Sequence, residues 1–167
     1  GFTALDGLMM GTRCGTLDPG VVLHLQTQMG LSPAGIDDLL YRKSGLLGVS
    51  GISSDMRILT ADPSRQSQEA VELFIWRAVR EFGALTASLG GVDGIVFTAG
   101  IGENHAEIRR RICERFDWLG LSIDDDANAA NALCISGGDS RVKVLVIPTD
   151  EERMIADHTL AVLRSGS

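Results

Sequence analysis

The stretch from Asp93 to Arg110 constrains the fold of this chain most. Residues 94–98, Gly-Ile-Val-Phe-Thr, form a short run rich in β-branched and aromatic residues, and Ala-Gly-Ile-Gly follows at 99–102. Ile108, Ile112 and Phe116 then recur at the spacing of one helix face. The pattern predicts a strand, a glycine turn and a helix, which is an α/β arrangement.

A strand that enters a helix through glycines brings unpaired backbone N–H groups to the positive end of the helix dipole. This indicates a phosphate or nucleotide site at residues 100–105. A tight turn that binds nothing is the alternative. The dinucleotide-binding fingerprint is excluded because His105 stands where its third glycine would be, and the sequence contains no Walker A loop.

A second strand is predicted at residues 142–147, where five of the six residues are apolar. Such a strand is buried on both faces, as in a parallel sheet, and the helical crossover makes a βαβ-type unit. Thr149 and Glu152 then have the spacing of a capping box, which leaves the carboxylate of Glu151 free at the carboxyl end of the strand. That carboxylate suits Mg²⁺, and an exposed acid at a helix start is the alternative.

Apolar periodicity and capping signals predict the other helices. The longest runs from Ser67 to Gly90 and should lie in the core. Shorter helices are predicted after Asp18-Pro19, after Ser32-Pro33 and over residues 124–133. Residues 46–55 are predicted to form a loop of small residues. The last helix is expected to turn three apolar side chains inward, namely Met154, Ile155 and Val162.

Arg13 lies between glycines in Gly11-Thr-Arg-Cys-Gly15. Glycines allow a loop to approach a ligand closely, and the planar guanidinium binds two oxygens of a phosphoryl or carboxylate group. A surface arginine in a flexible loop is the alternative. Asp55, Met56 and Arg57 follow a loop rich in serine and glycine and could frame a nucleoside. From these residues alone, an Asp–Arg surface pair is the favoured interpretation.

The composition narrows the class of protein. The 167 residues carry a net charge of −7, which disfavours a nucleic-acid partner, and no apolar run approaches the ~18 residues of a membrane span. The basic run Arg109–Arg111 lies beside Glu107 and Glu114 and is predicted to occupy a solvated helix face. Three widely spaced cysteines favour reduced thiols in a cytoplasmic protein.

Four stretches resemble the acetate kinase family, which includes the closely related propionate kinases. They are residues 1–15, 50–57, 97–104 and 147–152, in the family's order along the chain. The resemblance implies the actin-like, sugar-kinase-like (ribonuclease H-like) ATPase fold, mostly helical here with a few core strands. Residues 1–167 would then be an incomplete carboxy-terminal nucleotide-binding domain, with the amino-terminal half of the enzyme absent. The start at Gly1 and the small number of predicted strands agree with that expectation.

The resemblance implies an enzyme that reversibly transfers the γ-phosphoryl of ATP to acetate or propionate, giving an acyl phosphate and ADP. It further implies that Arg13 stabilises the transition state and that Glu151 binds Mg²⁺. By the same resemblance the nucleotide contacts Asp55, Met56, Arg57, Gly100, Ile101, Gly102, Glu103 and Asn104. The family's catalytic aspartate, phosphoryl-contacting histidine and substrate-binding arginine have no counterpart here, so the chain alone is expected to be inactive. The family also implies a homodimer, and a non-catalytic dimerising module is the alternative function.

Overall fold

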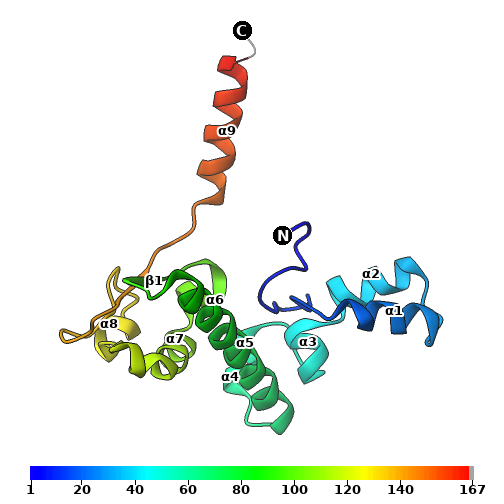
Figure 1. Ribbon diagram of the computed structural model, residues 1–167, viewed down its shortest axis with the longest axis horizontal. Coiled ribbons are helices and arrows are strands. Elements are labelled where there is room, and N and C mark those ends of the chain that lie inside the picture. Colours follow the sequence, from blue (N-terminus) through cyan, green and yellow to red (C-terminus); the bar gives the residue numbers. More distant parts are fainter. Residues whose placement is uncertain (166–167) are drawn as a thin grey trace. The chain divides into compact units, whose positions relative to one another are not determined.

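The computed structural model describes residues 1–165, apart from the side chains of Glu151 and Ser165. The chain divides into two compact units, Gly1–Val92 and Asp93–Ser167 (Figure 1). The prediction that both belong to one carboxy-terminal domain stays a prediction. None of the described helices is long and apolar enough to cross a membrane.

The first unit is built from helices. They are α1 (Pro19–Thr27), α2 (Pro33–Arg42), α3 (Gly45–Ser50), α4 (Met56–Ala61) and α5 (Arg65–Leu89). The predicted starts of α1 and α2 are confirmed, because the side chain of Asp18 accepts from the Gly20 N–H and that of Ser32 from the Gly35 N–H. The predicted loop at 46–55 is wrong in its first half, where α3 packs against α5 with Leu46 fully buried.

Helix α5 supplies much of the core of this unit. Its buried side chains lie mainly in its first half and include Val71, Phe74 and Ile75, as the periodicity predicts. Farther along, Leu85 is exposed, and Leu89 is 74% exposed just before the helix ends at Gly90. The core prediction is therefore confirmed for the first half of α5 and wrong for its last turn.

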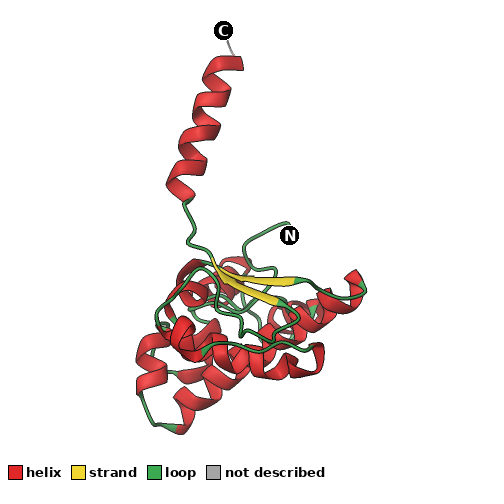
Figure 2. Ribbon diagram, turned by 90° about the vertical axis from the view of Figure 1, so that its left-hand side faces the viewer, coloured by secondary structure: helices red, strands yellow, loops and turns green. Residues whose placement is uncertain are grey.

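The second unit contains a parallel pair of strands with helices. Its elements are β1 (Gly94–Phe97), α6 (Ala99–Asn104), α7 (Ala106–Cys113), the 3₁₀ helix η1 (Glu114–Leu119), α8 (Asp125–Ala129), β2 (Lys143–Val146) and α9 (Glu151–Ser165). The register pairs Gly94 with Lys143 and Phe97 with Val146, which confirms the predicted parallel sheet (Figure 2). On its other edge β2 accepts and donates hydrogen bonds with residues 133–135.

Burial of the sheet differs from the prediction. Val144 and Val146 of β2 are buried, but Lys143 is exposed, and Val96 of β1 is 52% exposed. Only one face of β2 is therefore buried within this chain, so the expectation of two buried faces is wrong for the described residues. The reason is that the sheet has one covered side here, so alternate residues point to solvent.

The start of α9 also differs from the prediction. Arg153 donates its N–H to the Asp150 side chain (2.9 Å), so Asp150 caps the helix and the Thr149–Glu152 capping box is wrong. The three apolar side chains expected to face inward, Met154, Ile155 and Val162, are all exposed.

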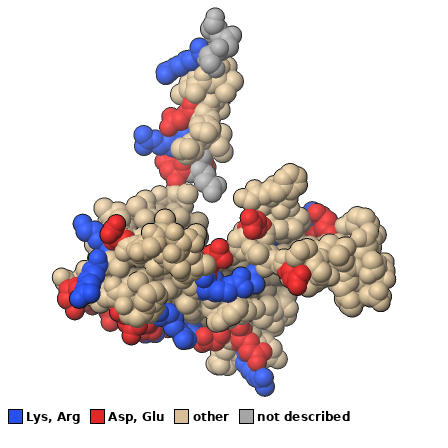
Figure 3. Space-filling model, viewed as in Figure 1, with Lys and Arg blue, Asp and Glu red and all other residues tan. Residues whose placement is uncertain are grey.

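On the face drawn in Figure 3 acidic and basic side chains are interspersed, so that face carries no basic stripe.

Candidate functional site

The loop that carries Arg13 is held by backbone hydrogen bonds. Leu46 and Leu47 donate to the carbonyls of Met10 and Gly11, and Ser44 donates to that of Thr12, each at 2.9 Å. The loop is thereby fixed to the start of α3. The sequence alone did not exclude the alternative of a flexible loop. A Cβ on Gly11 would lie 2.8 Å from the Ser54 carbonyl, so the loop also contacts the segment that leads to Asp55.

The Arg13 guanidinium lies 5.9 Å from the centre of the Tyr41 ring, and its Nη1 lies 3.9 Å from the Met10 sulfur. Among the described side chains, no carboxylate forms an ion pair with Arg13. An arginine on a fixed loop without a carboxylate partner can bind an anion without first breaking a salt bridge. This arrangement suits the predicted contact with a phosphoryl group.

Asp55 and Arg57 form the surface pair that the sequence favours. The carboxylate of Asp55 caps α4 through the Arg57 N–H (2.9 Å) and accepts a 2.6 Å bond from Arg57 Nη2. This hydrogen bonding raises the pKa of Arg57. Met56 between them is 2% exposed and belongs to the core. A shallow hollow of about 590 Å³ lies beside the pair and includes the exposed Ile58.

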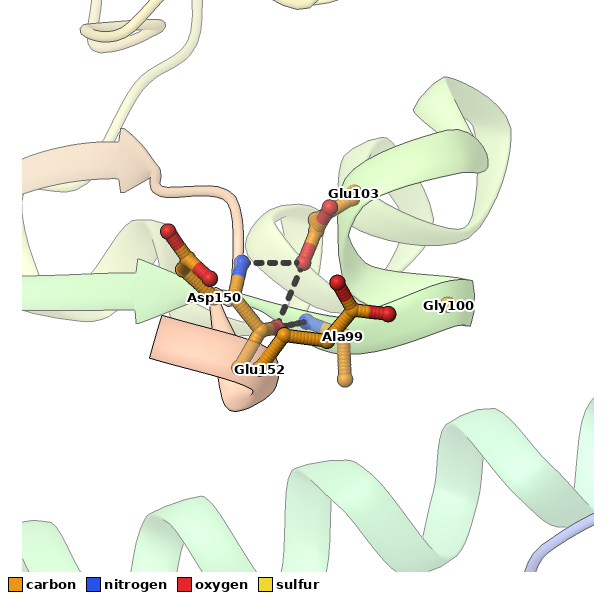
Figure 4. A pocket seen from close by; sticks show the side chains of 6 residues that line it. Ala99, Gly100, Glu103, Asp150 and Glu152 are labelled. Atoms are coloured by element: carbon orange, nitrogen blue, oxygen red, sulfur yellow. Dashed lines mark hydrogen bonds between the residues drawn. The ribbon is translucent and has the colours of Figure 1, made fainter. Parts of the chain in front are cut away.

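In the second unit β1 and β2 run parallel, so their carboxyl ends lie at the same edge of the sheet. Figure 4 shows Glu103, Asp150 and Glu152 beside Ala99 at this edge. Ala99 donates its N–H to Thr149 Oγ1 (3.0 Å), and the Thr149 N–H and hydroxyl both donate to Glu103 Oε1 at 2.9 and 2.7 Å. Thr98 Oγ1 lies 3.0 Å from Thr149 Oγ1. Thr149 therefore joins the segment after β2 to the start and the last turn of α6.

This connection shapes the turn after β1. Ala99 has a φ of +59°, a left-handed conformation that costs about 1 kcal/mol or more for a residue other than glycine. Gly100 and Gly102 lie inside α6, so the predicted glycine turn is replaced by a helix that starts directly after Thr98. Asn104 closes α6 by donating from Nδ2 to the Gly100 carbonyl (2.9 Å).

Acidic side chains surround an open hollow of about 500 Å³ at this point. It is lined by Ala99, Gly100, Glu103, Thr149, Asp150 and Glu152. The side chain of Glu151, the predicted Mg²⁺ ligand, lies outside the described residues. Mg²⁺ in proteins is bound by one or two carboxylates together with waters and phosphates. Asp150 and Glu152 offer carboxylates at this hollow, but among the described residues no group of three or more His, Cys, Asp or Glu side chains could hold a metal ion.

The hydrogen bonds from Thr149 hold the pKa of Glu103 below its ordinary value. A lowered carboxyl pKa in the folded state contributes stability above the ordinary glutamate pKa of about 4.3, and that contribution is lost as the pH falls through the lowered value. Replacing Thr149 by valine removes the hydroxyl donor but keeps the N–H donor. The contribution of Glu103 should therefore shrink without disappearing.

As the pH falls from about 5 to about 3, we expect the Thr149→Val chain to lose less stability than the parent. The reason is that the pKa of Glu103 is lowered less in the variant. Thermal unfolding followed by circular dichroism across that range measures the difference. Thr159→Val is the matched control, since within the described part of the chain the Thr159 hydroxyl donates to the Ile155 carbonyl of its own helix. Parallel pH profiles for the parent and Thr149→Val would contradict the assignment.

Two residues of this region are missed or misplaced by sequence reasoning. Thr149 is predicted as a helix cap and instead contacts Glu103, which lies 46 positions earlier. Arg109 is predicted to lie on a solvated face and is fully buried, whereas Arg110 pairs with Glu107 and Glu114 as expected. The signal for Arg109 is its position on the buried side of α7 with Ile108 and Ile112.

Solved structures of other proteins show which class of protein has this fold. The structure superimposes on the crystal structure of Porphyromonas gingivalis acetate kinase with a TM-score of 0.88 and 41% identity, over 98% of this chain and 42% of that one. For a propionate kinase from Francisella tularensis the TM-score is 0.85 and the identity 37%, over 93% and 41%. The fold is therefore that of the acetate and propionate kinases, the actin-like ATPase fold predicted from the sequence.

The family follows from the sequence comparisons. The model of the acetokinase family matches residues 1–157. The acetate kinase of Rhodopseudomonas palustris strain TIE-1 is 57% identical over 168 aligned positions, which are 99% of this chain and 42% of that protein. The chain belongs to the acetokinase family, and it spans about two fifths of the length of the curated relatives that it matches.

Proposed function

We propose that the full-length protein containing this chain is a short-chain carboxylate kinase. It transfers the γ-phosphoryl of ATP to acetate or propionate and also runs in reverse, with an acyl phosphate and ADP as the other reactant pair. The observation that carries this proposal is the acetokinase match over residues 1–157, which includes every predicted site residue. The non-catalytic module is not favoured, because the relatives that this chain resembles in sequence and in structure are kinases.

Phosphoryl transfer depends mainly on positioning and on stabilisation of the charge at the transferred group. Arg13 supplies that charge from the fixed loop. In the second unit, Gly100, Ile101, Gly102, Glu103 and Asn104 form α6 and hold the nucleotide. Asp55 and Arg57 contact the nucleoside at the surface of their unit, and Met56 supports them from the core, since it is 2% exposed.

Mg²⁺ is the metal that we propose for this reaction, with Glu151 as its ligand at the start of α9. When bound, the ion neutralises phosphate charge and orients the transferred group. The carboxylates of Asp150 and Glu152 lie on either side of Glu151 in sequence and line the same hollow as Gly100. An acidic edge beside the nucleotide segment supports this assignment.

The family resemblance and the composition support a proposal for the oligomeric state and compartment of the whole protein. We propose a cytoplasmic homodimer whose partners are ATP or ADP, the carboxylate and its own second copy, with neither nucleic acid nor membrane as a partner. All three cysteines are free, which agrees with a reducing compartment. The two units together form part of the carboxy-terminal nucleotide-binding domain.

The test is an assay of the full-length protein with ATP, Mg²⁺ and either acetate or propionate, in which acyl phosphate is trapped with hydroxylamine. We expect acyl phosphate with the full-length protein, its loss when Mg²⁺ is chelated, and none from residues 1–167 alone. ATP consumption without acyl phosphate would contradict the carboxylate as acceptor. Acyl phosphate made by the 167-residue chain would contradict the need for the missing part.

A further inference from the structure

Arg109 of α7 is 0% exposed and uses all five of its N–H donors. Nη1 donates to the carbonyls of Gly102 and Glu103, both at 2.8 Å. Nε and Nη2 donate to the side-chain and backbone oxygens of Asn128 at 2.8 and 2.7 Å, and Nη2 also donates to Asn131 Oδ1 at 2.6 Å. All five acceptors are neutral oxygens, so the guanidinium is held by its geometry and not by an ion pair.

These contacts bear directly on α6. With six residues, α6 is too short to be stable by itself, and the carbonyls of Gly102 and Glu103 lie at its end, where a helix leaves carbonyls without intrahelical partners. Arg109 satisfies two of those carbonyls. Its other donors reach Asn128 in α8 and Asn131 in the turn after α8. Asn128 is buried, and the Nδ2 of Asn128 donates to the Ala106 carbonyl. The end of α6 is thereby fixed to the two neighbouring helices.

The far end of this network is also fixed. Asn131 has a φ of +52°, which asparagine tolerates better than most residues, and this conformation accompanies the contact of its Oδ1 with Arg109. A lysine at position 109 would carry the same charge but only three donors from a single nitrogen, so it could not span all the acceptors. The arrangement therefore requires the arginine fork.

We propose that Arg109 is a positioning residue that sets the place of α6, and hence the affinity for the nucleotide, without contacting the nucleotide itself. This inference rests on the proposed function, in which α6 holds the nucleotide. It predicts that loss of the fork weakens nucleotide binding selectively, because α6 loses its connection to α7 and α8 while the remaining parts of the site keep theirs.

The experiment compares Arg109→Lys with Arg110→Lys in the full-length protein. Arg110 is the matched control, since it lies next to Arg109 on α7 but pairs at the surface with Glu107 and Glu114. For Arg109→Lys we expect the KM for ATP to rise about tenfold, as the loss of charge-assisted hydrogen bonds implies, with the KM for acetate changed less than about twofold. Arg110→Lys should leave both values near those of the parent.

A second measurement separates positioning from general stability. In the 167-residue chain, Arg109→Lys should speed amide hydrogen exchange in residues 99–105 about tenfold, with little change in residues 143–146 of β2. Faster exchange throughout the second unit, with an unchanged KM for ATP, would overturn the proposal. If Arg109→Lys does not fold, Asn131→Gly takes its place, because it removes one acceptor and keeps the backbone conformation.

For Asn131→Gly we expect a KM for ATP about threefold higher, and an unchanged KM would overturn the proposal. The proposed kinase function and the positioning role of Arg109 are contradicted by different results. If the parent protein makes no acyl phosphate, the proposed function fails, while the exchange of residues 99–105 still tests whether Arg109 orders α6.

Discussion

Replacing Arg13 by alanine in the full-length protein should lower kcat by about a thousandfold or more, with the KM for ATP changed less than about threefold. The reason is that an arginine which stabilises the transferred phosphoryl acts mainly in the transition state, so its loss affects turnover more than ground-state binding. Steady-state kinetics in the direction of acyl phosphate formation measure both values.

Arg42→Ala is the matched control for Arg13→Ala. Arg42 is exposed at the end of α2 in the same unit, and its guanidinium lies 3.5 Å from Asp38 and 3.8 Å from Asp37. Its removal should leave turnover within about twofold of the parent, since an exposed ion pair contributes little. A kcat for Arg13→Ala equal to that of Arg42→Ala would remove Arg13 from the mechanism.

Arg13→Lys asks whether the charge alone suffices. Lysine keeps the positive charge but presents a single nitrogen in place of the planar fork. We expect Arg13→Lys to recover only part of the loss, because a phosphoryl group offers two oxygens to the fork. Full recovery would show that Arg13 acts as a point charge.

Local signals in the sequence account for the parts of the fold that were predicted. The strands at Gly94–Phe97 and Lys143–Val146 and the long helix α5 follow from the apolar pattern within each segment. The parallel pairing of the strands follows from the helical crossover between them. The caps at Asp18 and Ser32 need only the next two or three residues. Such features survive in any fold that uses the segment, so the sequence alone predicts them.

The errors involve contacts between residues far apart in the chain. Thr149 and Asp150 are both good helix caps, and Glu103, 46 positions away, takes the hydrogen bonds of Thr149 and leaves Asp150 as the cap. Arg109 lies in a basic run, but Asn128 and Asn131 make its burial possible by accepting three of its five hydrogen bonds. Neither outcome can be found from the spacing of residues within one helix.

The candidate site shows the same division. The sequence patterns and the family resemblance locate Arg13 and the segment Gly100–Asn104, because glycine and charge mark those segments locally. Thr149 and Arg109 both form hydrogen bonds with that segment. These contacts are visible only in the three-dimensional structure, where the carboxyl ends of the strands and the three helices come together. Residues that act through contacts far apart in the chain are therefore harder to predict than residues that a local pattern marks.

Gly45 shows how closely the fold of the first unit and the Arg13 loop depend on each other. It begins α3 with a φ of +63°, and a Cβ added there would clash with the Met10 carbonyl oxygen and lie 2.8 Å from that of Arg13. Both contacts are with backbone, which cannot move aside like a flexible side chain. A side chain at position 45 would therefore push the Arg13 loop away from α3.

Gly45→Ala should destabilise the chain by about 3 kcal/mol or more, through the left-handed backbone and the contact with the loop together. In the full-length protein it should also lower kcat, because Arg13 is displaced. Gly51→Ala is the matched control: Gly51 ends the same helix at a φ of +65°, but its added Cβ meets nothing within 4 Å. That variant should cost only about 1 kcal/mol and keep turnover. Urea unfolding of both variants measures the difference, and equal losses of stability would show that the loop yields to a side chain at position 45.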